Sequence, residues 1–268
     1  MRRISLSAVF VLLSAHFASG HEFWIDPHDF TIEPGEKVTA DLRIGQEFEG
    51  GSFPYIPSNI ERFDIVSGDS ILAVRTRIGN RPALDQVIPD NGLWVVVHET
   101  TDQRLTYVEE GIFEAFVRHK DLEGTLEAHA ERRLPDLGFA ENYRRFAKSL
   151  IAVGDGKGAD QELGLRTELV ALTNPYADDF NGEMRVRLLF EGAPRADAQV
   201  EVFERAPNGQ VSIGTTRTNS DGVASFAVKS GHVYLADAVK MLPLEGDEAG
   251  VLPVWYSLWA SLTFSVGE

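Results

Sequence analysis

Histidine carries most of the chemistry that this sequence could support, because its 268 residues include seven histidines and no cysteine. Without cysteine there is no disulfide framework, no thiolate metal site and no cysteine nucleophile. A metal ion would therefore have to bind histidine, carboxylate or backbone groups. His21 is the most interesting of the histidines, because it directly follows a segment that has the features of a cleavable leader.

The first twenty residues have the three regions of a secretory signal peptide. Two arginines give a positive start, an apolar run covers residues 4–17, and small residues, Ala18 and Gly20, occupy both positions that determine cleavage. The sequence therefore predicts export, most simply to the periplasm, with cleavage between Gly20 and His21. No later segment is long and apolar enough to span a bilayer, so we expect no membrane insertion after cleavage.

Cleavage before His21 would place a free α-amine and an imidazole in one residue. These nitrogens form a chelating pair, and a second histidine opposite them would complete a three-nitrogen histidine brace that favours Cu(II). The amine must lose its proton, which is feasible because its reference pKa is about 7.7–8.0 and the metal competes for the lone pair. We expect one Cu(II), with Ni(II), Co(II) or Zn(II) as alternatives. The competing interpretation is an ordinary solvated histidine.

Two further histidines are the preferred partners of His21 in this predicted metal site. His98 ends an apolar strand pattern over residues 93–97, where a rigid sheet can present a ligand. His129 lies in a segment with helical spacing, and His28 ranks third. Each of these histidines, taken alone, is more often a surface or capped residue than a ligand.

The loop over residues 48–57 combines aromatic residues with chain-breaking glycine and proline. Phe53 and Tyr55 could line a ligand groove, or they could plug the open end of a sandwich. The sequence contains none of the Gly-x-Ser-x-Gly, His-Glu-x-x-His or Gly-x-Gly-x-x-Gly enzyme motifs. We therefore assign no catalytic residues and do not expect an enzyme.

Composition narrows the classes of partner. Hydrophobic residues make up 43% of the chain and charged residues 25%, which is enough apolar material for a folded core. The 41 acidic and 25 basic residues give a net charge of −16, which repels phosphate backbones and anionic lipids. We expect no nucleic-acid partner. A metal ion and a membrane transporter or envelope protein are the partners that fit.

Short alternating runs predict the elements that position the N-terminal candidates. Apolar and polar residues alternate over 37–44, the period of a half-buried strand. Similar runs separated by turn-forming clusters continue to about residue 108. This pattern predicts an antiparallel, Ig-like β-sandwich over residues 21–110.

The pattern changes after residue 110. Apolar residues recur at three- and four-residue spacings between 111 and 153, which predicts two amphipathic helices broken near 134–138. The first would carry Ile112, Phe113, Phe116 and Val117, and the second Tyr143, Phe146, Ala147 and Leu150. We expect a helical connecting segment over residues 111–165.

The last third of the chain returns to a β pattern. Residues 256–266 alternate between an apolar face and a serine- and threonine-rich face. The order Gly-x-Pro, Thr-x-Thr-Asn-x-Asp-Gly and Gly-x-x-Tyr over 192–234 resembles transthyretin-like and carboxypeptidase-regulatory-like modules. A second β-sandwich is therefore expected over residues 166–268, in a mainly β chain of two sandwiches.

Several stretches together resemble a known family. They are residues 21–25, 45–63, 143–154 and 255–264, in that order. The family comprises secreted bacterial proteins of unknown function once labelled nickel-uptake (NikM-like) proteins and catalogued as periplasmic components of cobalt and nickel transport. The resemblance implies this architecture and a periplasmic role near transition-metal handling. The chain departs from it at Lys240, where similar proteins often have histidine, and lysine cannot ligate a metal at neutral pH unless its pKa falls greatly.

Three functions are compatible with these observations. The first is a periplasmic transition-metal-binding protein, a carrier or accessory in copper, nickel or cobalt uptake or homeostasis. The second is a metal-independent structural or partner-binding sandwich protein of the cell envelope. The third is a copper-dependent oxidase that uses the brace. Stability without metal would favour the second, and peroxide-dependent turnover of a polysaccharide would favour the third.

Overall fold

A computed structural model describes residues 21–245 and 252–267, so the predicted signal peptide lies outside the described residues. The chain is mainly β, with two short α-helices and one 3-10 turn. The elements of the first half are β1 (Glu22–Pro27), β2 (Thr31–Ile32), β3 (Lys37–Gln46), β4 (Glu49–Phe53), η1 (Pro57–Asn59), β5 (Ile60–Ser67), β6 (Ser70–Ala73), β7 (Leu84–Val87), β8 (Gly92–Thr100), β9 (Gln103–Thr106), α1 (Ile112–His119) and α2 (Thr125–Glu131). Those of the second half are β10 (Ala140–Val153), β11 (Thr167–Ala171), β12 (Glu183–Phe190), β13 (Ala193–Pro194), β14 (Gln199–Arg205), β15 (Val211–Arg217), β16 (Val223–Ala227), β17 (Val233–Pro243) and β18 (Trp255–Ser265).

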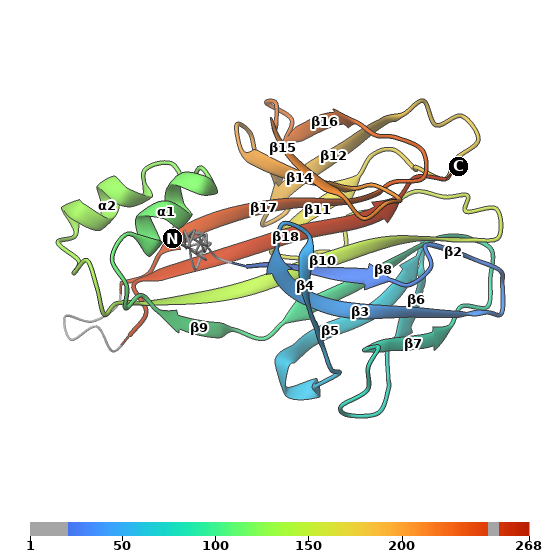
Figure 1. Cartoon of the computed structure of the whole chain (residues 1–268), viewed down its shortest axis with the longest axis horizontal. Helices are drawn as coiled ribbons and strands as arrows, with labels where there is room; N and C mark the ends of the chain where they lie inside the picture. Colours follow the sequence, from blue (N-terminus) through green and yellow to red (C-terminus); the bar gives the residue numbers. More distant parts are fainter. Residues whose placement is uncertain (1–20, 246–251, 268) are drawn as a thin grey trace, which may run out of the picture.

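Three sheets make up the fold (Figure 1). A central sheet has the order β15-β14-β17-β18-β10-β8-β5-β6, with β2 and β9 also paired to β10. An N-terminal sheet consists of β1, β3, β4 and β7, and a third sheet consists of β11, β12, β13 and β16. Most pairs are antiparallel, but β10 pairs in parallel with both β18 and β2.

The central sheet buries both of its faces. On β8, Leu93, Val95 and Val97 pack into a core shared with the third sheet. Trp94 and Val96 point to the opposite face, into a core shared with the N-terminal sheet. The expected mainly β sandwich architecture is therefore confirmed, and its two cores share one sheet.

The helix predicted over residues 143–150 is wrong, because this stretch belongs to the 14-residue strand β10. Phe146 and Leu150 are four residues apart, a spacing that places them on one side of a helix but equally on one face of a strand. They face the core shared with the third sheet, whereas Ala147 and Ile151 face the other core. A strand covered on both faces loses the simple alternation that identifies half-buried strands.

The alternation in the last strand is confirmed, but its polar face is not exposed to solvent. Leu258, Ala260 and Leu262 lie in the core, as expected. On the other face, β1 crosses the strand, and the hydroxyls of Ser261 and Thr263 donate to backbone oxygens of β1 at 2.7 Å each. The hydroxyls thus fix the N-terminal strand on the central sheet.

The helices cover the end of the same face (Figure 1). Phe113, Phe116 and Val117 of α1 are buried against Trp255 and Trp259 of β18, which confirms the first predicted amphipathic helix. Within residues 21–245 and 252–267, no helix is both long enough and apolar enough to cross a membrane.

The predicted division of the chain at residues 111 and 165 concerns folding units and stays a prediction. Strands from both predicted sandwiches pair within the central sheet, through β10 and β18. The helical part of the connecting segment is limited to α1 and α2.

Candidate functional site

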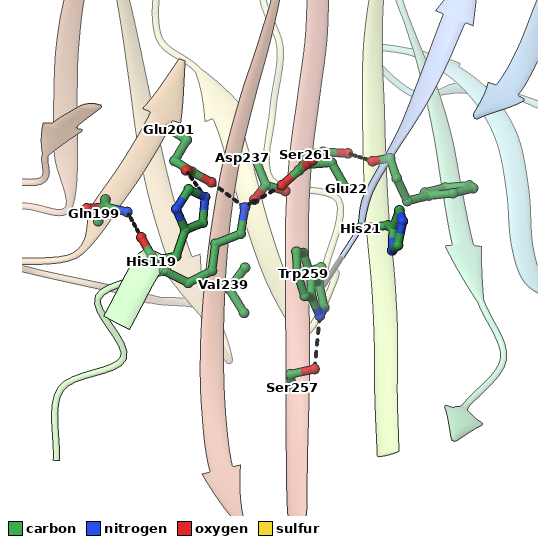
Figure 2. A network of polar contacts seen from close by, with 12 residues as sticks. His21, Glu22, His119, Gln199, Glu201, Asp237, Val239, Ser257, Trp259 and Ser261 are labelled. Atoms are coloured by element: carbon green, nitrogen blue, oxygen red, sulfur yellow. Dashed lines mark hydrogen bonds and ion pairs between the residues drawn. The ribbon is translucent and has the colours of Figure 1, made fainter. Parts of the chain in front are cut away.

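A buried ion cluster lies where α1 meets the sheets (Figure 2). The Lys120 ammonium lies 2.6 Å from Glu22 Oε1 and 3.1 Å from Asp237 Oδ2, and it also donates to Glu201 Oε2. All four side chains are at most 5% exposed. We refer to these four residues as the Lys120 cluster.

Four separate elements position the cluster. Glu22 is the first residue of β1, and Lys120 directly follows α1. Glu201 and Asp237 are directly paired across β14 and β17, so their side chains are neighbours. The Lys120 ammonium also lies 5.1 Å from the centre of the Trp259 ring, within the range of a cation–π contact.

The cluster has more carboxylates than cations, and its pKa values reflect this. Burial raises the pKa of Asp237 to about 7. Burial opposes the charge on Lys120, but Asp237, Glu22 and Glu201 outweigh it and raise the lysine pKa. Burial also acts to raise the pKa of Glu201, but the hydrogen bonds and charges of His119 and Lys120 lower it.

The three carboxylates could themselves hold a cation. Among the described residues, Glu22, Glu201 and Asp237 are the one group of three or more potential ligands whose oxygens all lie within 4.8 Å of one another. The Lys120 ammonium already occupies the centre of this arrangement. A metal ion there would have to displace it.

A cavity of about 250 Å³ lies beside α1, and Phe116 and Trp259 are among its lining residues. We call it the His21 cavity, because His21 is exposed and lies on its lining. Tyr107, Tyr143 and Arg145 also line it, together with the carboxylates of Glu109 and Glu141.

Glu141 anchors a buried hydrogen-bond chain in this cavity. Tyr107 donates to Glu141 Oε2 at 2.6 Å, and Ser257 donates to the other carboxylate oxygen. Trp259 Nε1 donates to Ser257 Oγ at 2.9 Å, as Figure 2 shows. Burial raises the pKa of Glu141 to about 7.

Arg145 connects the N-terminal segment to the cavity. Its Nη2 donates to the backbone oxygen of His21 at 3.1 Å, and its guanidinium lies 4.6 Å from the centre of the Tyr143 ring. Burial lowers its pKa, while the charges of Asp237 and Glu22 act in the opposite direction.

The three histidines of the predicted metal site do not form a three-ligand group among the described residues. His98 is 2% exposed and packs between the rings of Phe23 and Phe63. It lines a different cavity from His21, and Tyr143 and Arg145 line both cavities. The two imidazoles therefore line separate cavities, and Arg145, which lines both, would be a neighbour of a metal ion at either histidine.

His129 already uses both ring nitrogens. Trp255 Nε1 lies 3.0 Å from its Nδ1, and its Nε2 lies 3.2 Å from the backbone oxygen of Pro135. Since indole can only donate and a carbonyl can only accept, the ring is neutral with its proton on Nε2. Burial lowers the pKa of His129, in agreement with this neutral form. Ligation of a metal would break one of these hydrogen bonds.

Lys240 lies away from the cluster and the N-terminus. Its neighbours in β17, Ala238 and Leu242, belong to the core shared with the third sheet, and its ammonium lies 4.7 Å from the centre of the Phe190 ring. Asp237 and Val239 point to the other face of the strand. A histidine in place of Lys240 would therefore not join His21.

The two aromatic residues of the predicted ligand loop have different surroundings. Phe53 is 44% exposed and lines the cavity that contains His98. Tyr55 packs on the N-terminal core, with its ring 6.4 Å from that of Phe63. The groove interpretation fits Phe53, and the plug interpretation fits Tyr55.

Sequence reasoning missed the Lys120 cluster. Glu201 and Asp237 each interrupt an apolar strand, in Val200–Phe203 and Tyr234–Val239, and a charge inside such a run indicates a buried partner. That signal was available in the sequence. The identity of the partner, Lys120, was not, because it is more than 80 residues away from either carboxylate.

The fold and these sites define a class of β-sandwich protein with a buried ion cluster beside a small, partly aromatic cavity. The chain belongs to the family described as "Domain of unknown function (DUF4198)", which matches residues 18–241. Among solved structures, the "D0-D1 domain of Intimin" aligns with 91% of this chain and 98% of its own, at 14% identity and a TM-score of 0.24. This similarity is too distant to support a functional inference. A comparison with curated proteins gives no match.

Proposed function

We propose that the mature chain is an exported, periplasmic transition-metal-binding protein, a carrier or accessory in metal uptake or homeostasis. It holds one Cu(II) at His21 through the α-amine and one imidazole nitrogen, with Ni(II), Co(II) and Zn(II) as weaker competitors. A role in nickel uptake, which the label of the similar proteins implies, is one form that this proposal takes.

The charge around the N-terminal segment carries the proposal. Two cations, Lys120 and Arg145, are buried beside four carboxylates, which belong to Glu22, Glu141, Glu201 and Asp237. A cation bound at the adjacent His21 would reduce this imbalance. It would also favour the ionised forms of Asp237 and Glu141, whose pKa values burial raises to about 7.

The residues near His21 fit a mixed nitrogen and oxygen donor set. His21 is exposed, so a metal can reach its side chain without a conformational change. Glu109 and Glu141 line the same cavity and offer carboxylate oxygens in place of the third nitrogen of a brace. With two nitrogen ligands, affinity for Cu(II) is expected to be lower than that of a complete brace.

A one-residue extension tests the proposal. The mature chain beginning at His21 is compared with a chain that has one alanine before His21, which keeps every side chain but moves the amine out of chelating reach. Competition titrations with Cu(II) are expected to show at least about tenfold weaker binding by the extended chain, about 1.4 kcal/mol. His28→Ala is the control: the His28 ring already contacts Thr39 Oγ1 at 3.1 Å and Asp41 Oδ2 at 3.4 Å, so its removal should leave Cu(II) binding unchanged. Equal affinity of the extended and parent chains would exclude chelation by the amine.

A second candidate is the metal-independent, partner-binding protein of the cell envelope. Ile71, on the edge strand β6, and Ile78, in the loop that follows, are 61% and 73% exposed. Exposed apolar groups at a sheet edge offer a surface for another chain. This candidate predicts that neither chelators nor the alanine extension changes thermal stability.

A further inference from the structure

The second cavity has a volume of about 220 Å³ and lies between the N-terminal sheet and the end of β8. Its walls are mainly apolar, with Phe23, Ile44 and Ile60 among the lining residues. Phe53 and Ile56 also line it and are 44% and 36% exposed, so they form its mouth. We call it the His98 cavity.

His98 contributes an unpaired polar group to this cavity. The residue is 2% exposed, and neither Nδ1 nor Nε2 has a hydrogen-bond partner. Burial lowers its pKa to about 3, so the ring is neutral near pH 7 and offers one N–H donor and one lone pair. Buried polar atoms without partners are uncommon and destabilising, so this pair of atoms calls for a ligand or ordered water.

Arg145 gives the cavity a second unpaired hydrogen-bond donor and a positive charge. Its Nε is buried without a hydrogen-bond partner, while its Nη2 donates to the backbone of His21. Among the described residues that line the His98 cavity, Arg145 is the one charged side chain. The lining therefore offers an anion one charged partner, although the carboxylates of Glu22 and Asp237 also act on Arg145 and reduce its effect.

We propose that the His98 cavity binds a small monocarboxylate with an apolar body. The nitrogens of His98 and Arg145 Nε are covered by neighbouring atoms in this structure, so the two side chains turn toward the cavity when the ligand binds. The carboxylate then accepts hydrogen bonds from Arg145 Nε and from the His98 ring N–H, and the apolar body packs on Phe23 and Ile60. Arginine–carboxylate hydrogen bonds are among the stronger ones in proteins.

The size of the cavity sets the size of the ligand. Apolar cavities of about 150 Å³ stay dry and take up benzene-sized molecules. A cavity of about 220 Å³ has room for such a ring and a carboxylate. Water alone would be poorly held by the apolar walls, although it could satisfy His98.

Titration calorimetry of the mature protein with benzoate tests this proposal, with benzamide as a neutral probe of similar shape. Benzoate is expected to bind with a Kd below about 1 mM and benzamide at least about tenfold more weakly. Equal affinity for the two compounds, or no binding of benzoate, would overturn the proposal, and the second result would leave water as the partner of His98.

Two further measurements locate the site. His98→Leu keeps the apolar wall and is expected to weaken benzoate binding at least about tenfold, while His28→Leu, which changes an exposed histidine, should leave it unchanged. Because His98→Leu could fail to fold, imidazole ¹⁵N resonances are followed in the parent protein. Benzoate should shift the His98 resonances, and a shift confined to other histidines would contradict the assignment. The alanine extension before His21 leaves this cavity intact, so failure of the metal proposal would be seen separately.

Discussion

Two lysines are buried within residues 21–245 and 252–267, and the difference between their surroundings distinguishes a structural site from a candidate functional one. Lys148 on β10 lies 2.7 Å from Asp160 and 2.9 Å from Glu168, and all three side chains are at most 1% exposed. Lys120 is equally buried but has three carboxylate partners.

The carboxylates around Lys148 have additional donors. Glu168 accepts hydrogen bonds from the backbone of Leu163 and Leu165, and Asp160 accepts one from the backbone of Ala171. In the Lys120 cluster, by contrast, Asp237 Oδ1 is buried without a partner. A buried ion pair costs little free energy of folding only when all its polar atoms have partners. The Lys148 site is therefore best explained as a structural clamp. The Lys120 cluster, in contrast, retains unbalanced charge beside His21.

The strongest test of this comparison removes each lysine in turn. Lys120→Met leaves three buried carboxylates facing one another and is expected to lower the free energy of unfolding by about 3–5 kcal/mol. Lys148→Met should cost at least about 1 kcal/mol less, because backbone N–H groups still bind its two carboxylates. Urea denaturation followed by circular dichroism measures both. A larger loss for Lys148→Met would reverse the distinction.

A smaller effect is expected from the pH dependence of Asp237. Its folded pKa of about 7 lies above the unfolded value of about 3.9, so between these values the folded chain binds a proton that the unfolded chain releases. Ionisation of Asp237 therefore lowers the free energy of unfolding as pH rises from about 4 to 7. Asp237→Asn should remove that loss and be more stable than the parent at pH 8 by about 1–3 kcal/mol, with a smaller gain at pH 5. Thermal unfolding at the two pH values measures this, and a variant that loses stability mainly at pH 8 would contradict it.

The smallest effect is expected at the exposed side of the cluster. His119 Nε2 lies 2.9 Å from Glu201 Oε1, and this hydrogen bond raises the histidine pKa. The resulting stabilisation is present below the unfolded pKa of about 6.5 and is lost as pH rises through the folded value. Since the His119 side chain is 55% exposed, His119→Ala should cost about 0.5 kcal/mol at pH 5.5 and less at pH 9. A cost that grows with pH would show that the charged histidine is not the stabilising form.

The sequence predicts those elements of the fold whose pattern of apolar and polar residues is local and unambiguous. The alternation in residues 37–44 and 256–266 and the helical spacing of Phe113, Phe116 and Val117 are local, and each led to the correct element. For β10 the local signal was ambiguous, because a strand buried on both faces also places apolar residues four apart.

The sites were harder to predict, because their partners are distant in sequence. The hydrogen bond that Trp255 donates to His129, for example, joins residues 126 positions apart. The Lys120 cluster likewise joins residues from Glu22 to Asp237. Pairings at such separation follow from strand order, which no local pattern encodes.

Metal analysis of the protein isolated from the periplasm, together with its intact mass, tests the central claim most directly. The account predicts a chain that begins at His21 and carries about one copper ion per molecule, which is lost when an alanine precedes His21. A chain that begins at His21 and is isolated without transition metal, and that does not take up Cu(II) afterwards, would contradict it.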